Sequence, residues 1–250
     1  MNPNISHQFE LRFRTTGTEG ESYDYHLRLI QKFLNFVGNF DPLLKATEWL
    51  IATGERQSSY LYSVFDENGP TSAALAVLNE QAKGNDAVKS LTLWNGQEDR
   101  IKGASISCMF ARQDGAASSF NLSIRSPREK MRLGSWEQVA ETLASAVKVF
   151  APIYGAVETM YYQGVFNGRP GVGWMLYLPR ALTVQQVPEA HAVVPVMGKD
   201  EKSKDKQLGT ILVSVTDGPF TEDNPEHVKI ANAIEIRLVD QDLLPRFSDL

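Results

Sequence analysis

The chain has 250 residues, a formal net charge of -5, and a composition that is 42% hydrophobic and 22% charged, which is ordinary for a globular protein with a real core. The acidic balance makes it a poor non-specific ligand for nucleic acid and suits a basic protein partner. No apolar run reaches the roughly 18 residues that a membrane span needs, and the N-terminus lacks the apolar core of a signal peptide. We therefore expect a cytoplasmic protein built from one large domain or two small ones.

The first hundred residues alternate strand and helix signals. Phe9 to Arg14 alternates apolar and charged residues, which is the period of a half-buried strand. Ser22 is placed to cap a helix that Gly38 ends, and Thr71 or Ser72 begins a shorter helix. Further strands are expected, in chain order, at 43–52, 60–65 and 90–94. This alternation suits a sheet that helices cover on one face.

A polar, turn-rich stretch at 95–100 marks the softest boundary of the chain. We expect an N-terminal α+β subdomain over 1–100 and a C-terminal α+β subdomain over 101–250, with one compact unit as the alternative. The two halves could be similar subdomains, although their sequences do not align.

The second half continues the alternation. Ser135, with Gln138 three residues on, has capping-box spacing and opens a helix that Pro152 ends. Asn224 followed by Pro225 begins the last helix. Strands are expected at 104–111, 119–124, 153–162 and 208–216, with a hairpin turn at 113–115, a charged, flexible loop at 197–207, and a tail that docks through Leu243, Leu244 and Phe247. The pattern predicts an α+β fold of mainly antiparallel sheets covered by amphipathic helices.

The most constrained stretch runs from Gly164 to Arg180, where a cluster of glycines precedes an apolar run that Pro179 ends. It predicts a tight loop that leads into a central strand. Gly171 and Gly173 have the G-x-G spacing of a dinucleotide loop, but the third glycine is absent and a strand is expected where a helix should begin. We therefore interpret these glycines as a structural turn.

Signatures of catalysis and of metal binding are missing from the sequence. The single cysteine, Cys108, lies in an apolar run and is interpreted as a core residue. The four histidines show no metal-ligand spacing: His7, His26, His191 and His227. No G-x-S-x-G motif is present, and nothing selects two carboxylates as an acid and base pair. We predict no catalytic residue, no metal and no cofactor; an enzyme with a site assembled from distant residues is the alternative.

Acidic residues gather near the C-terminus. Four surround the Pro219-Phe220 turn and two follow the last helix: Asp217, Glu222, Asp223, Glu226, Asp240 and Asp242. One interpretation is a solvated face with favourable charge at a helix N-terminus. The other is a docking surface for a basic partner, where carboxylates speed the encounter and aromatic anchors supply the affinity.

Seven stretches, spread along nearly the whole chain, together resemble a known protein family in sequence and in order. They are SHQFELRFRT, YDYHLRLIQKFL, FDENGPTSAALAVL, SWEQVA, RPGVGWMLYLPR, LGTILVSVTD and DNPEHVKIANAIEIRLVDQDLLPRF. This set resembles the immunity protein 52 family of bacterial polymorphic toxin systems. The resemblance implies a non-enzymatic α+β protein of the cytosol that binds a cognate toxin, here a nuclease of restriction-endonuclease-like fold delivered by type VI secretion.

The resemblance identifies no interface residues and leaves two modes of inhibition open. Acidic residues and aromatics could cover the basic nucleic-acid groove of the toxin, or binding elsewhere could block its dimerisation or closure. The six acidic residues named above form our candidate toxin-binding set. We expect no direct contact with nucleic acid or membrane. The alternative function is an adaptor or chaperone that loads an effector onto the secretion machinery.

Overall fold

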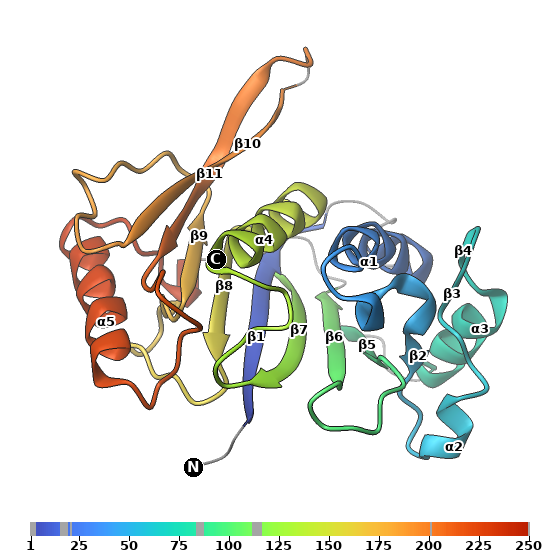
Figure 1. Ribbon diagram of the computed structural model, residues 1–250. Helices are drawn as coiled ribbons and strands as arrows, with labels where there is room; N and C mark the ends of the chain where they lie inside the picture. The colour runs from blue at the N-terminus through green and yellow to red at the C-terminus, as the bar shows by residue number, and fades with distance from the viewer. Residues whose placement is uncertain are drawn as a thin grey trace.

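The structure is a computed structural model that describes residues 4–15, 20, 22–83, 88–111, 117–200 and 202–249. One antiparallel sheet of nine strands runs through the molecule (Figure 1). Its order is β10 (Ala192–Lys199), β11 (Asp205–Val213), β9 (Met175–Leu178), β8 (Tyr154–Thr159), β1 (Asn4–Phe13), β7 (Ser118–Pro127), β6 (Ala104–Ala111), β5 (Val88–Trp94) and β2 (Leu50–Ile51). A small second sheet pairs β3 (Phe65–Asp66) with β4 (Gly69–Pro70).

The described residues form five α-helices and three 3-10 helices, which confirms the expected α+β class. They are α1 (Tyr23–Val37), α2 (Arg56–Ser59), α3 (Ser72–Gln81), α4 (Trp136–Phe150), α5 (Pro225–Asp240), η2 (Pro42–Leu44), η3 (Ala46–Glu48) and η4 (Phe247–Asp249). None of these helices is long and apolar enough to cross a membrane in the part of the chain that the structure describes.

The core lies between one face of the sheet and the helices α1 and α4, which lie side by side over it (Figure 1). Every second residue of β1 is buried toward these helices, while the alternate residues are only partly buried. Aromatic rings join the layers: Phe120 of β7 stacks on Phe150 of α4 at 4.7 Å and meets Phe33 of α1 edge-on at 5.6 Å. Burying one such side chain contributes roughly 2–3 kcal/mol.

Helix ends follow the capping signals of the sequence. The Ser22 hydroxyl accepts a hydrogen bond from the backbone of α1, and Gly38 ends that helix. Ser135 and Gln138 form the expected capping box of α4, and Ala151 ends it in the left-handed conformation, with φ 45°, just before Pro152. Thr71 caps α3 and Asn224 caps α5. These four helix starts are confirmed.

Two of the expected strands are largely wrong. The stretch 43–52 forms η2 and η3, and only its Leu50–Ile51 part is a strand. The Asp41 carboxylate caps η2 through Leu43, and the Trp49 indole donates to the Leu44 carbonyl at 3.2 Å. These local bonds favour tight turns over an extended chain. The stretch 60–65 follows the short helix α2 and becomes a strand only at Phe65.

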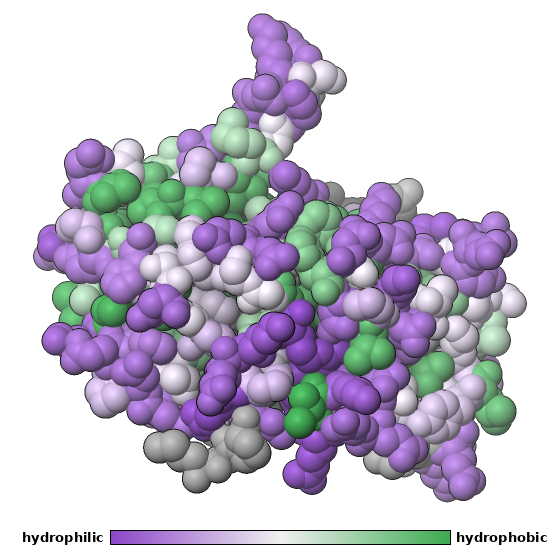
Figure 2. All heavy atoms as spheres, in the orientation of Figure 1, coloured by the Kyte–Doolittle hydropathy of each residue, from purple (hydrophilic) through white to green (hydrophobic). Residues whose placement is uncertain are grey.

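The charged loop expected at 197–207 is also corrected. β10 continues to Lys199 and β11 begins at Asp205, so most of this stretch is paired as a hairpin with a register shift after Val196. Lys199 and Asp205 form an ion pair across it at 2.6 Å. The hairpin projects from the body (Figure 1), and its tip is hydrophilic (Figure 2). Charged residues suit these strands because both faces of a projecting hairpin meet solvent.

The expected boundary at 95–100 falls on the connection between β5 and β6, which pair along their length. β1, from the first range, lies between β7 and β8, both from the second. Strands of the two ranges therefore share one sheet, and their division into two subdomains stays a prediction.

The C-terminal tail packs back onto the body. Leu244 is buried and Leu243 packs against the core. The Phe247 ring lies 5.9 Å from that of Tyr154, and the Phe247 amide donates to the Gly168 carbonyl at 2.8 Å. The Arg169 guanidinium also donates to the Leu244 carbonyl. The tail thus docks on β8 and on the glycine-rich loop.

Candidate functional site

The face of β5, β6, β7 and β1 that is opposite α1 and α4 carries polar side chains, and we call it the open face. Cross-strand register places two rows on it: Trp94, Ser105, Ser123 and Gln8 in one, and Thr92, Ser107, Asn121 and Glu10 in the next. These residues are exposed or partly buried. Because side chains alternate along a strand, the same strands bury apolar residues on the other face.

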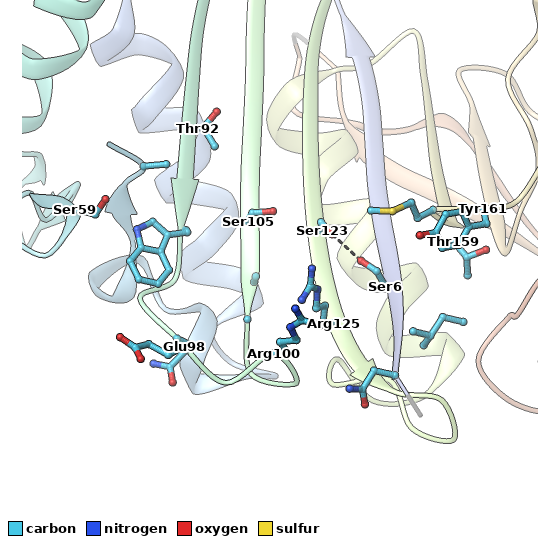
Figure 3. A pocket seen from close by; sticks show the side chains of 18 of the residues that line it. Ser6, Ser59, Thr92, Glu98, Arg100, Ser105, Ser123, Arg125, Thr159 and Tyr161 are labelled. Atoms are coloured by element: carbon cyan, nitrogen blue, oxygen red, sulfur yellow. Dashed lines mark hydrogen bonds between the residues drawn. The ribbon is translucent and has the colours of Figure 1, made fainter. Parts of the chain in front are cut away.

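A hollow of about 1100 Å³ lies over one end of the open face (Figure 3). Its floor includes Ser6, Ser105 and Ser123, and the hydroxyls of Ser6 and Ser123 lie 2.8 Å apart. One wall comes from the segments next to β2 and β5, and the other from the segment after β8 and from residues 222–223. A second depression of about 430 Å³ continues along β1, β6 and β7.

Three arginines line this hollow. Arg128 follows β7, while Arg100 from the β5–β6 connection and Arg125 from β7 reach into it (Figure 3). Arg100 and Arg125 are exposed. The Arg125 amide donates to the Gly103 carbonyl at 3.3 Å, which brings β7 next to the end of that connection. Among the described residues, neither guanidinium group has a hydrogen bond or an ion pair. They are cations available to a partner.

Carboxylates flank the two arginines. On the β5 side, Glu98 accepts a hydrogen bond from the Tyr60 hydroxyl at 3.2 Å. On the β8 side, Asp223 forms an ion pair with Arg128 at 2.5 Å, and Glu222 also lines the hollow. Carboxylates from separate segments therefore line the hollow together with three arginines, one of which is paired with Asp223.

Large apolar side chains stand at the walls of the hollow. Tyr161 is 75% exposed and Met160 is 52% exposed, both just after β8. On the opposite side the rings of Tyr60 and Trp94 lie 5.5 Å apart. Exposed aromatic residues beside a polar floor are typical of protein-binding surfaces.

The structure divides the six acidic residues of the predicted set between the two ends of α5. Asp217, Glu222, Asp223 and Glu226 lie before or at its start, and only Glu222 and Asp223 line the hollow. Asp240 and Asp242 lie at its end. A helix of this length spans about 24 Å, so the six do not form one compact cluster.

The glycine-rich loop is held by a buried carboxylate. Glu235 of α5 is fully buried and accepts three hydrogen bonds, from the Tyr162 hydroxyl at 2.5 Å, the Val165 amide at 2.7 Å and the Val172 amide at 2.9 Å. A Cβ atom on Gly164 would lie 2.9 Å from this carboxylate. Two amides of the loop, those of Val165 and Val172, are thus already bonded to a buried carboxylate, and β9 follows as predicted.

The remaining candidates for chemistry are structural. Cys108 is buried, and burial raises the pKa of its thiol to about 12. His7 is buried against the Phe220 carbonyl at 3.0 Å, and burial lowers the pKa of its imidazole to about 4. His26 is buried as well and bonds the Gly20 carbonyl at 2.7 Å. Within the described ranges, no three His, Cys, Asp or Glu side chains are placed to hold a metal ion.

Sequence reasoning missed Arg100, Arg125, Met160 and Tyr161. A signal for Arg125 was present: β7 alternates apolar residues with Asn, Ser and Arg, which marks one polar face. That alternation did not indicate the pairing of β6 with β7 that brings Arg100 close to Arg125.

Comparison with known proteins places the chain in a family. The family model described as Immunity protein 52 matches residues 16–246. Among solved structures, the fold is similar to that of the Pseudomonas aeruginosa T6SS protein PA0821, with a TM-score of 0.51 and 12% sequence identity over 95% of this chain and 76% of that chain. At this identity the likeness shows a shared fold. No curated protein sequence matches.

Immunity proteins bind cognate toxins, and members of this family are typically non-enzymatic. This agrees with the expectation, drawn from the missing catalytic signatures, that the chain is not an enzyme. The family match spans nearly the whole chain, from before α1 to the docked tail. The protein therefore belongs to the immunity protein 52 family.

Proposed function

We propose that this protein is the cytoplasmic immunity partner of an antibacterial nuclease toxin delivered by type VI secretion, and that it neutralises the toxin by direct binding. Membership of an immunity family supports the binding role. The fold shared with a T6SS protein supports the link to that secretion system. A nuclease that attacks cytoplasmic DNA has to be met in the cytoplasm.

The observation that carries the proposal is the open face. This face of the sheet is polar, hollowed over about 1100 Å³, and rimmed by exposed side chains such as Tyr161 and Met160. A stable interface needs a surface where aromatic anchors can be desolvated beside a polar rim. We place the toxin on this face, so that the immunity protein would occlude the toxin's active site or block the toxin's assembly.

The acidic set stays part of the proposal as an electrostatic guide. Reversing the charge of Asp217, Glu222 and Glu226 to lysine should slow association with the toxin by about tenfold and flatten its salt dependence. The Glu67→Lys and Glu129→Lys double variant is a control, because both residues are exposed and lie outside the hollow. Equal association rates for both variants would remove these carboxylates from the interface.

Co-expression with the product of the neighbouring gene tests the function. The toxin alone should stop growth and degrade plasmid DNA, and the pair should grow, co-purify and leave the plasmid intact. Co-purification with an active nuclease would instead indicate an adaptor or chaperone. Absence of both rescue and co-purification would refute the proposed function.

A further inference from the structure

The hollow carries charges of both signs, which restrict its partner. Figure 3 shows Arg100 and Arg125 over β6 and β7 with Glu98 on the β5 side. Glu222, from the segment before α5, also lines the hollow. Carboxylates from two segments therefore accompany these two arginines, and the third arginine of the hollow, Arg128, is already paired with Asp223. A complementary surface carries carboxylates opposite the two arginines and basic residues opposite the carboxylates.

Arg100 and Arg125 suit carboxylates in particular. A guanidinium group presents a planar fork of donors that matches a carboxylate with two parallel hydrogen bonds. The hydroxyls of Ser6, Ser105 and Ser123 on the floor supply further donors within the same hollow. Because neither arginine has a side-chain partner among the described residues, no ion pair within that part of the protein has to break for them to bind.

A metal-dependent nuclease has the reverse pattern. Its carboxylates hold a divalent cation at the centre of a cleft, and lysines and arginines along that cleft neutralise phosphates. We propose that Arg100 and Arg125 bind the metal-ligating carboxylates of the cognate toxin, while Glu98 and Glu222 face the basic walls of its cleft. This inference rests on the proposed function and assigns its mode as direct occlusion of the active site.

A nucleic acid is the competing occupant, because arginines and hydroxyls also bind phosphate. The flanking carboxylates and the net charge of -5 oppose a polyanion along the hollow. A protein carboxylate at the two arginines meets no such repulsion, since basic residues accompany it.

The test measures affinity for the purified toxin, obtained as the product of the neighbouring gene, with an Arg100→Glu and Arg125→Glu double variant. We expect binding to weaken by about 100-fold, because two charge-assisted contacts become repulsive. An Arg180→Glu and Arg246→Glu variant is the matched control, since both arginines are exposed and lie outside the hollow. It should bind within about threefold of the wild type. Circular dichroism and thermal melting confirm that each variant is folded. If the double variant does not fold, the single Arg100→Gln variant, on an exposed connection, replaces it in the binding measurement.

Competition with magnesium separates the proposed contact from a general charge effect. If the arginines occupy the metal-ligating carboxylates, raising Mg²⁺ should weaken wild-type binding beyond a control of equal ionic strength in NaCl. The double variant should lose this extra dependence. Unaltered affinity and unaltered Mg²⁺ dependence in a folded variant that still inhibits the nuclease would overturn the inference and leave the proposed function intact.

Two further outcomes complete the test. Wild-type binding to a 20-base-pair DNA duplex in 150 mM salt that the double variant loses would overturn the inference in favour of nucleic acid. A wild-type protein that binds no toxin at all would refute the proposed function, and the inference with it.

Discussion

Glu235 should be the polar side chain whose loss costs this fold most. It is fully buried in α5, and its carboxylate accepts hydrogen bonds from Tyr162, Val165 and Val172. These three donors belong to the segment that connects β8 to β9. The Glu235→Ala variant removes all three acceptor contacts while leaving the donors in place.

The size of the effect follows from this count. Each buried donor left without an acceptor costs about 1–3 kcal/mol, and water that enters the space of the missing side chain recovers part of the total. We expect a loss of roughly 3–5 kcal/mol, a large share of the 5–15 kcal/mol that stabilises a typical domain. For a chain of this length, that loss lowers the melting temperature by about 6–20 °C.

Urea unfolding followed by circular dichroism and by tryptophan fluorescence measures this loss. Tyr162→Phe removes one of the three bonds and should cost about 1 kcal/mol. Glu226→Ala, an exposed position on the same helix, should change stability by less than about 0.5 kcal/mol. If Glu235→Ala costs no more than Glu226→Ala, the carboxylate does not hold the loop and the reasoning is wrong.

Three further predictions concern groups near or beneath the sheet. Burial is the main cause, and the charges of nearby carboxylates the second, of the rise in the pKa of Glu158 from an ordinary 4.5 to about 8. The folded state therefore holds this proton more tightly than the unfolded state does, and the free energy of unfolding falls as pH rises from 4.5 to 8. Glu158→Gln should remove that slope and be more stable than the wild type by up to about 4 kcal/mol at pH 8, whereas Glu129→Gln at an exposed site should keep the slope in the same titration of unfolding. The thiol of Cys108 should stay unreactive toward a disulfide reagent at pH 8 in the native protein, and one thiol per chain should react in denaturant. Fast labelling of the native protein would contradict the burial of Cys108. Gly173 has φ +51°, and a Cβ there would lie 2.5 Å from the Glu158 Cβ, so Gly173→Ala should lose at least about 2 kcal/mol in urea unfolding; a neutral effect would contradict this strained turn.

Local signals in the sequence predicted a good part of the fold. Ser22, Ser135 and Asn224 mark the starts of α1, α4 and α5, because a capping side chain bonds amides only two or three residues away. Strand periodicity located β1, β5, β6, β7 and β11 for a similar reason. It predicted the wrong element at 60–65, where apolar residues pack around a turn after α2. At 197–207 the density of charged residues predicted a loop, although most of this stretch is paired as a hairpin.

The candidate site was predicted less well. The acidic set was chosen by its density along the chain, yet α5 separates Asp217 from Asp240 by its whole length. The two arginines were missed because each is unremarkable in its own segment. Arg100 follows a turn and Arg125 lies near the end of a strand, and they become neighbours only because β6 pairs with β7.

The sequence by itself determined the starts of α1, α3, α4 and α5, the burial of Cys108 and the family. Each depends on contacts within a few residues, or on a pattern that survives in the linear order. Only the tertiary structure decided which strands pair, which face stays open, and which side chains meet over the hollow. His7 pairs with Ile124 on one side and Thr159 on the other, separations of more than a hundred residues that no local period encodes. The physical reason is that strand partners are selected by the packing of the whole sheet, and the proposed toxin-binding surface exists only once that sheet has formed.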